Sequence, residues 1–242
     1  SFIKTYGIVH PGEQYESNRN IRLAPMHASE RELGAVFYET AGWERPHWYE
    51  SNADLLEQYG EAVMPREHEW DSRWWSPIIN AEHLAMRERA GMVDLTAFAI
   101  FDVIGPKAME TVQRIIVAQA DVQIGRVIYT PVLDDRGGFR SDLTVMRLAH
   151  DTFRVVTGGA HGMADFKWFS DRMPADGGAV CVNVTSSWTT VGLWGPKALD
   201  ILGSLTDADV SSGTFKFGTC QNIEIGNLPV LASRISYVGE FG

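Results

Sequence analysis

The sequence predicts an α+β fold, built mostly from antiparallel sheets with flanking helices. From residue 77 onward, short segments with the alternating hydrophobicity of strands are separated by turns rich in Gly and Asp. In addition, residues 104–108 (Ile-Gly-Pro-Lys-Ala) recur as residues 194–198 (Trp-Gly-Pro-Lys-Ala), each time between an expected strand and an expected helix. This repeat predicts two similar strand–Gly-Pro–helix subdomains rather than a parallel, doubly wound sheet. Chance, or simple helix-start chemistry, is the alternative explanation for so short a repeat.

Local signals predict the individual elements. A helix over residues 82–90 ends before Gly91, a residue that tolerates the left-handed backbone of a helix C-cap. Pro106 suits the first position of a second helix, and residues 163–172 are expected to form a third. Strands are expected at residues 98–104, 127–133, 143–148 and 153–157, around a turn at 134–138.

The N-terminal part differs in composition from the rest. Five of the eight tryptophans lie between residues 43 and 75, where the hydrophobic pattern has no regular period. Residues 30–40 are expected to form a short helix, which the segment 42–46 ends. The sequence therefore predicts an aromatic-rich linker over residues 1–76, packed on a second domain over residues 77–242.

Composition and charge restrict the class of protein. The 242 residues are 45% hydrophobic, with 31 acidic and 21 basic side chains and a formal net charge of −10. An acidic chain without a Lys/Arg cluster argues against nucleic acid or an anionic membrane as a partner, although a few arginines suffice for a small anionic ligand. The most apolar stretch, residues 92–104, contains Asp94 and Asp102 and is shorter than the ~20 residues of a membrane-spanning helix.

Several cofactor classes lack their motifs. Cys181 and Cys220 stand without a CxxC motif or a histidine at metal-ligand spacing, which predicts two buried thiols in a reducing cytoplasm and no metal site. The chain also has no GxGxxG, P-loop, HExxH or GxSxG sequence, and its seven histidines are scattered. We therefore expect neither a nucleophilic triad nor a dinucleotide cofactor bound by this chain alone.

The segment 129–145 is the strongest candidate for chemistry. A strand ends, the Gly137-Gly138 turn reverses the chain, and Asp142 stands at the head of the returning strand. A carboxylate in this position can point into a cleft, where it accepts N–H donors or stabilises a cation. It can equally serve the turn by accepting backbone N–H groups. The spacing alone leaves both interpretations open.

This segment resembles the folate-binding aminomethyltransferase family, which includes the T-protein of the glycine cleavage system. In that family a strand, a Gly-Gly turn, an Asp pair and an apolar strand follow one another. Four ordered segments carry the resemblance: 93–96, 133–142, 192–196 and 234–242. Further segments are similar to the linker before the folate domain of dimethylglycine and sarcosine dehydrogenases: 6–13, 32–37, 42–46 and 74–77.

The resemblance implies an enzyme that transfers one-carbon units to tetrahydrofolate. In the dehydrogenases, a separate FAD domain oxidises a methylated amine, and the one-carbon unit is captured as 5,10-methylenetetrahydrofolate. By position, Asp142 matches the carboxylate that orients folate and supports attack by its reacting nitrogen. The resemblance further implies folate contacts at Tyr129, Tyr237, Arg234 and, through its backbone, Gly158. Each tyrosine can alternatively be a packed strand residue.

Three departures from the family pattern accompany the resemblance. Ser141 replaces the first Asp of the pair, and Gly158 stands where the family has a folate-contacting Asn. Gly242 precedes the position of a pterin-binding Glu, so we expect a folate domain truncated before its C-terminal barrel domain. FAD is then expected only on a parent chain or partner domain. The alternatives are a free-standing aminomethyl- or methyltransferase, and a non-catalytic folate-binding or interaction module.

Overall fold

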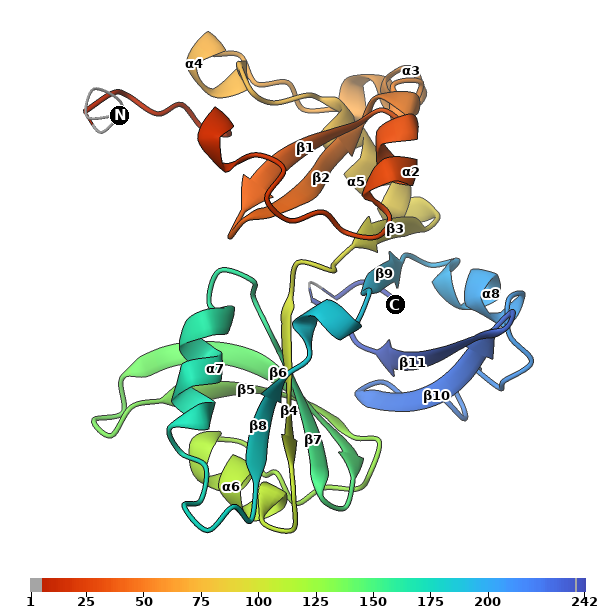
Figure 1. The fold of residues 1–242 in the computed structure, drawn as a ribbon. Coiled ribbons are helices and arrows are strands. Elements are labelled where there is room, and N and C mark those ends of the chain that lie inside the picture. Colours follow the sequence, from red (N-terminus) through yellow and green to blue (C-terminus); the bar gives the residue numbers. More distant parts are fainter. Residues whose placement is uncertain (1–5, 238) are drawn as a thin grey trace.

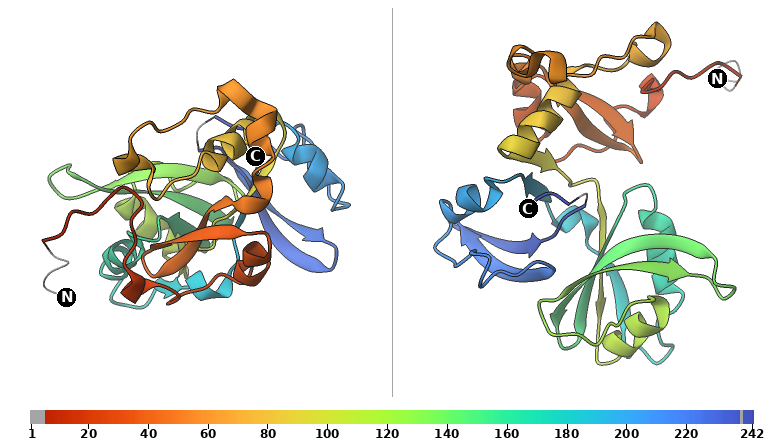
Figure 2. Two further views of the ribbon diagram at one scale, coloured as in Figure 1. Left: turned by 90° about the horizontal axis from the view of Figure 1, so that it is seen from above. Right: turned by 180° about the vertical axis from the view of Figure 1, so that it is seen from behind.

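The computed structural model describes residues 6–237 and 239–242, which form three parts (Figure 1). An N-terminal part contains a two-stranded sheet with short helices, the second part contains a five-stranded sheet with two helices, and the third contains a β-hairpin with one helix. In both side views the N-terminal part lies above the other two, which lie side by side (Figures 1 and 2).

The N-terminal part is built around one antiparallel strand pair. Strands β1 (Ala35–Thr40) and β2 (Trp43–Tyr49) form its sheet. Its helices are α2 (His27–Glu32), α3 (Leu55–Tyr59), α4 (Glu69–Ser72) and α5 (Ile78–Glu88), with single 3₁₀ turns η1 (Glu16–Asn18), η2 (Glu50–Asn52) and η3 (Gly60–Ala62).

The prediction of a helix over residues 30–40 is wrong beyond Glu32. Helix α2 ends at Glu32, Gly34 has φ of +73°, and β1 begins at Ala35. The run of β-branched and aromatic residues at 36–38 favours the strand. Pro46 also does not end the element: it lies inside β2, opposite Phe37 and beside a register shift. Proline is tolerated there because both strands of a two-stranded sheet are edge strands.

The second part is an antiparallel sheet with the strand order β5-β6-β7-β4-β8. Its strands are β4 (Ala99–Ile104), β5 (Val127–Leu133), β6 (Phe139–Ala149), β7 (Thr152–Thr157) and β8 (Val180–Asn183). Helices α6 (Ala108–Ile115) and α7 (Gly162–Ser170) cover one face and bury the main core, which includes Phe101, Val112, Val145, Phe153 and Phe169. Strands β4, β5 and β7 and helix α7 agree closely with the elements expected from the sequence. Strand β8 was not expected, and β6 begins four residues earlier than expected, so Asp142 lies inside the strand rather than at its head.

The opposite face of this sheet packs against the third part. The hairpin of β10 (Thr219–Ile225) and β11 (Leu228–Arg234) supplies Cys220 and Leu231 to a small cluster with Val127 and Met146 of the sheet. Helix α8 (Ala198–Gly203) completes this part. Strand β3 (Gly91–Asp94) leads out of the N-terminal part and pairs with β9 (Val191–Trp194), which follows the 3₁₀ turn η4 (Thr185–Ser187).

The repeated Gly-Pro sequences adopt the same local structure, which confirms two similar strand–Gly-Pro–helix units in an antiparallel α+β fold. Gly105 follows β4 with φ of +136°, and Gly195 follows β9 with φ of +116°. In each copy the glycine carbonyl accepts the amide of the residue that begins the helix, at 2.8 Å for Ala108 and 3.0 Å for Ala198. The repeat is therefore a structural device that turns each strand into a helix.

Three further findings concern the thiols, metals and membranes. Cys181 and Cys220 are free thiols, and burial raises the pKa of Cys181 to about 11. Among the described residues, no group of three His, Cys, Asp or Glu side chains could hold a metal ion. Within the same residues, no helix has the length and apolar character needed to cross a membrane.

Candidate functional site

Asp142 and Tyr129 meet on neighbouring strands of the five-stranded sheet. Their strands pair antiparallel, with Pro131 opposite Asp142 and Tyr129 opposite Thr144. Both side chains are exposed on the face that α6 and α7 leave uncovered, and the Tyr129 hydroxyl donates a hydrogen bond to Oδ2 of Asp142. This hydrogen bond, with some desolvation, raises the pKa of Tyr129. The arrangement presents a carboxyl group beside a 70%-exposed aromatic ring.

The turn that precedes Asp142 is held by a different carboxylate. Asp134 Oδ1 accepts the backbone amides of Arg136 at 2.9 Å and Gly138 at 2.8 Å. These two hydrogen bonds lower the pKa of Asp134. Gly137 adopts φ of +78°, which suits glycine in the tight reversal. The backbone-capping role that the sequence allowed for Asp142 is therefore filled by Asp134, and the side chain of Asp142 faces outward beside Tyr129.

Gly158 lies at the same end of the sheet as Asp142. Strands β6 and β7 pair with Thr144 opposite Val156. Continued by two residues, this register brings Asp142 opposite Gly158, which directly follows β7. Among the described residues, and leaving out the two chain neighbours, the atom nearest to a Cβ built on Gly158 is His161 Cδ2, at 3.7 Å. A side chain at this position would therefore meet no clash, and Gly158 itself is half-buried.

Tyr237 lies between two aromatic residues. Its ring stacks on Phe98 with centroids 6.2 Å apart and meets Trp194 edge-on at 6.0 Å. Phe98 immediately precedes β4, so these contacts fix Tyr237 near the start of that strand. Burial, followed by the charge of Glu240, raises the pKa of Tyr237, although 53% of the residue stays exposed. Phe98 was not singled out from the sequence, where it is only the first apolar residue of an alternating strand.

Arg234 is used inside the third part. It is buried at the end of β11, where its guanidinium donates to the Phe215 carbonyl at 2.6 Å and to Ser212 Oγ at 3.1 Å. Its Cζ also lies 4.9 Å from the ring centroid of Phe241. The structure therefore assigns Arg234 contacts that organise the loop before β10, and a folate contact for this residue stays a prediction.

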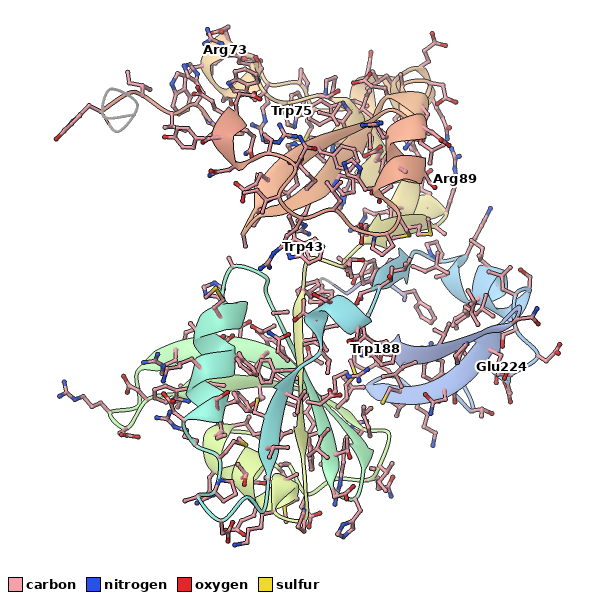
Figure 3. The ribbon with its side chains drawn as sticks, in the orientation of Figure 1. Trp43, Arg73, Trp75, Arg89, Trp188 and Glu224 are labelled. Atoms are coloured by element: carbon pink, nitrogen blue, oxygen red, sulfur yellow. The ribbon has the colours of Figure 1, made fainter. Side chains whose placement is uncertain are left out.

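A cleft of about 500 Å³ lies between the N-terminal part and the sheet. Arg22 and Trp43 line it from above, and residues at the start of β4, at the start of α7 and in the η4 segment line it from below. Trp43 lies at the lower edge of the N-terminal part, and Trp188 lies between the sheet and the hairpin (Figure 3). Arg154 Cζ sits 4.0 Å from the Trp188 ring centroid while its guanidinium binds Asp102. Sequence spacing could not indicate this cleft, because its lining residues come from five separate stretches of the chain: 22–25, 43, 96–99, 159–163 and 183–189.

Comparisons with known proteins agree with this fold. The family model described as the GCVT N-terminal domain matches residues 26–242. The 4-methylaminobutanoate oxidase (formaldehyde-forming) of Paenarthrobacter nicotinovorans is 32% identical over 240 residues, which cover 99% of this chain and 28% of that protein. The mitochondrial sarcosine dehydrogenase of Mus musculus is 30% identical, over 100% of this chain and 30% of that protein.

One further relative and one solved structure are aminomethyltransferases. The aminomethyltransferase of Saccharopolyspora erythraea is 31% identical over 91% of this chain and 52% of that protein. The crystal structure of glycine cleavage system aminomethyltransferase T from Bartonella henselae has a TM-score of 0.69 at 24% identity, covering 92% of this chain and 52% of that one, and shares the fold. The chain spans less than a third of the first two relatives and about half of the transferase. With a family model matched over most of its length, this chain belongs to the GCVT N-terminal domain family.

Proposed function

We propose that this chain is the tetrahydrofolate-binding part of an enzyme similar to dimethylglycine and sarcosine dehydrogenases. The proposed reaction forms 5,10-methylenetetrahydrofolate from the one-carbon unit of an oxidised methylated amine. The observation that carries the proposal is the pair of Asp142 and Tyr129, exposed on the sheet face opposite α6 and α7. The similarity to sarcosine dehydrogenase over the whole chain supports the dehydrogenase-like context.

Asp142 would supply the polar chemistry. When a folate nitrogen attacks an iminium or formaldehyde carbon, the nitrogen gains positive charge until it loses a proton. A carboxylate beside that nitrogen stabilises the charge and can accept the proton. The Tyr129 hydroxyl holds Oδ2 of Asp142, which leaves Oδ1 for the folate. Asp142 is thus proposed as the catalytic residue.

Aromatic surfaces and backbone groups would hold the flat pterin ring. Tyr129, exposed at 70%, would offer its ring for stacking, and Tyr237, which already packs on Phe98 and Trp194, would offer the part of its side chain that stays exposed. Gly158 would contribute backbone contacts at the same end of the sheet. Arg234 is proposed as a further folate contact, through guanidinium donors other than those that bind Phe215 and Ser212.

The domain organisation and location are part of the same proposal. The proposed division is a linker over residues 1–76 and a folate domain over residues 77–242, although the matched family model begins at residue 26 and helix α5 packs on α3 and β2 of the N-terminal part. FAD would be bound by a parent chain or partner domain. The free thiols of Cys181 and Cys220 support a reducing compartment such as the cytoplasm.

A tetrahydrofolate titration tests the binding function. Trp194 contacts Tyr237, so folate binding there is expected to change tryptophan fluorescence and to raise the melting temperature. A saturable response in both signals supports the proposal. A protein that shows neither, in the form in which the cell makes it, is instead an interaction module without folate.

A second measurement distinguishes a dehydrogenase-like enzyme from a free-standing transferase. The 31% identity to an aminomethyltransferase keeps a free-standing transferase as the second candidate. Oxidation of sarcosine or dimethylglycine with a flavin signal, by the protein as the cell makes it, supports the dehydrogenase-like assignment. Folate-dependent transfer without any flavin supports the transferase.

A further inference from the structure

One buried carboxyl group binds two hydroxyls from neighbouring strands. Oδ2 of Asp165 accepts the Ser141 hydroxyl at 2.8 Å and the Thr157 hydroxyl at 2.6 Å. All three residues are buried, with exposed fractions of 8% for Asp165, 5% for Ser141 and 3% for Thr157. Because a single oxygen receives both hydroxyls, the ends of β6 and β7 are joined through one atom of α7.

Asp165 itself is held firmly by the helix that carries it. It lies in the first turn of α7, and its amide donates to the His161 carbonyl at 2.9 Å. The start of α7 lies close against β4, since a Cβ built on Gly162 would be 2.2 Å from Ala99 Cβ. Phe169 then anchors the end of the helix in the main core. The carboxyl group of Asp165 is therefore held in place on the sheet face that α7 covers.

The two residues that Asp165 binds directly precede two proposed folate positions. Ser141 is followed by Asp142, and Thr157 by Gly158. Consecutive residues of a strand point to opposite faces, so a Ser141 side chain held toward α7 directs Asp142 to the uncovered face. Thr157 is held in the same way, and its hydrogen bond therefore limits the movement of the next residue, Gly158.

The hydroxyl pair acts where the pairing of β6 with β7 stops, although β5 still pairs with Ser141 and Asp142 on the other side of β6. The β6–β7 ladder reaches Thr144 opposite Val156 and does not extend to Asp142. Beyond that pair, the hydrogen bonds of Ser141 and Thr157 to Asp165 connect the two strand ends. Without this connection, we expect the ends to separate and Asp142 to lose its fixed position relative to Gly158.

We propose that Asp165 is a positioning residue, which orients Asp142 and the Gly158 backbone for folate through Ser141 and Thr157. This inference rests on the proposed function. Misplacement of a catalytic group by about 1 Å can lower a rate on the order of 100-fold, so a loss of at least about 10-fold in one-carbon transfer is expected when the connection is broken.

Matched substitutions at Thr157 provide the test, in the protein as the cell makes it. Thr157→Val keeps the shape and removes the hydroxyl, whereas Thr157→Ser keeps the hydroxyl. We expect Thr157→Val and Asp165→Ala each to lower kcat for one-carbon transfer about 10-fold or more, and Thr157→Ser to stay within about twofold of the unmodified protein. Adding Thr157→Val to Asp165→Ala should lower kcat little further, because Asp165→Ala already removes the hydrogen bond between the two residues.

Thr111→Val is the control for buried hydroxyls in general. Thr111 is fully buried in α6 and its hydroxyl has no hydrogen-bond partner among the described residues, so its removal is expected to leave transfer unchanged. Hydrogen exchange gives a readout independent of activity: amides at residues 139–143 and 157–159 should exchange faster in Thr157→Val than in Thr157→Ser.

The outcomes separate this inference from the proposed function. If the unmodified protein binds no tetrahydrofolate, the proposed function is wrong. If it binds and transfers, but Thr157→Val and Asp165→Ala change only the melting temperature, the positioning role is overturned while the function stands. Should Asp165→Ala fail to fold, the comparison of Thr157→Val with Thr157→Ser decides alone.

Discussion

The hydroxyl of Tyr129 on β5 donates a hydrogen bond to the carboxylate of Asp142 on β6, on the face of the five-stranded sheet opposite α6 and α7. Neither residue contributes to the main core on the other face. Substitutions at this pair can therefore test function with little effect on folding.

Asp142→Asn is expected to lower one-carbon transfer on the order of 100-fold, because an amide neither carries the charge nor accepts the proton. The melting temperature should change little, since the side chain is exposed. Product formation and thermal unfolding measure the two effects. Asp135→Asn, at an exposed turn residue of the same hairpin, should leave transfer unchanged. Unchanged transfer in Asp142→Asn would rule out the catalytic role.

The same hydrogen bond predicts a pH dependence. It raises the pKa of Tyr129, so the phenol stays protonated at pH values where an ordinary tyrosine ionises. A raised pKa means that the contribution of this bond is complete below the ordinary tyrosine pKa and is lost as the pH rises through the pKa of Tyr129 in the folded protein. In Asp142→Asn the pKa of Tyr129 should fall toward its ordinary value. Phenolate absorbance, with Tyr129→Phe subtracted, measures it, and an identical titration in both proteins would contradict the bond.

Asp102→Ala is expected to destabilise the fold by about 3–5 kcal/mol, because it leaves a buried guanidinium without its partner. Asp102 binds Arg154 through two hydrogen bonds of 2.9 Å, with side-chain exposures of 10% and 9%. Denaturant unfolding measures the loss. Asp171→Ala, which breaks the exposed pair with Lys167, serves as the control and should cost at most about 1 kcal/mol. Equal effects of the two substitutions would show that burial of the Asp102–Arg154 pair adds nothing to the cost of breaking it.

Gly105→Ala and Gly195→Ala are each expected to destabilise the protein by more than about 2 kcal/mol, since strain and a clash combine. A Cβ on Gly105 would be 2.5 Å from the Gly178 carbonyl oxygen, and one on Gly195 would be 2.5 Å from two such oxygens. Gly177→Ala, with φ of +73° and open space around it, should cost only about 1–2 kcal/mol. Thermal unfolding compares the three variants, and equal melting temperatures would disprove the clash.

The sequence predicts the five-stranded sheet well and the N-terminal sheet poorly. Residues 141–145 of β6 alternate between buried and less buried positions because one face is packed on helices, and this alternation is visible in the sequence. All six residues of β1 are half-buried, so its hydrophobic pattern has no period. Pro46 also makes β2 hard to predict, because a proline argues against a strand in the middle of a sheet. It is tolerated here because both strands of a two-stranded sheet are edge strands.

At the candidate site, sequence spacing predicts positions but not directions. The motif places Asp142 and Tyr129 on adjacent strands, and the antiparallel register then brings them together. The same reasoning cannot show that Arg234 turns inward to Phe215, because its partner lies in an irregular segment. Nor does local sequence indicate Asp165, a helical residue whose two partners come from different strands.

The short β3–β9 ladder has a consequence for how the molecule folds. All five strands of the central sheet lie between these two paired segments, so the chain leaves and re-enters the sheet part at neighbouring points. The sheet can therefore form from one continuous stretch of chain. The β3–β9 ladder, in contrast, closes a loop of the residues between these two strands, and closing so long a loop costs conformational entropy. We expect the sheet to be an autonomous folding nucleus, and the four-residue ladder to lock the N-terminal part in place as the last step.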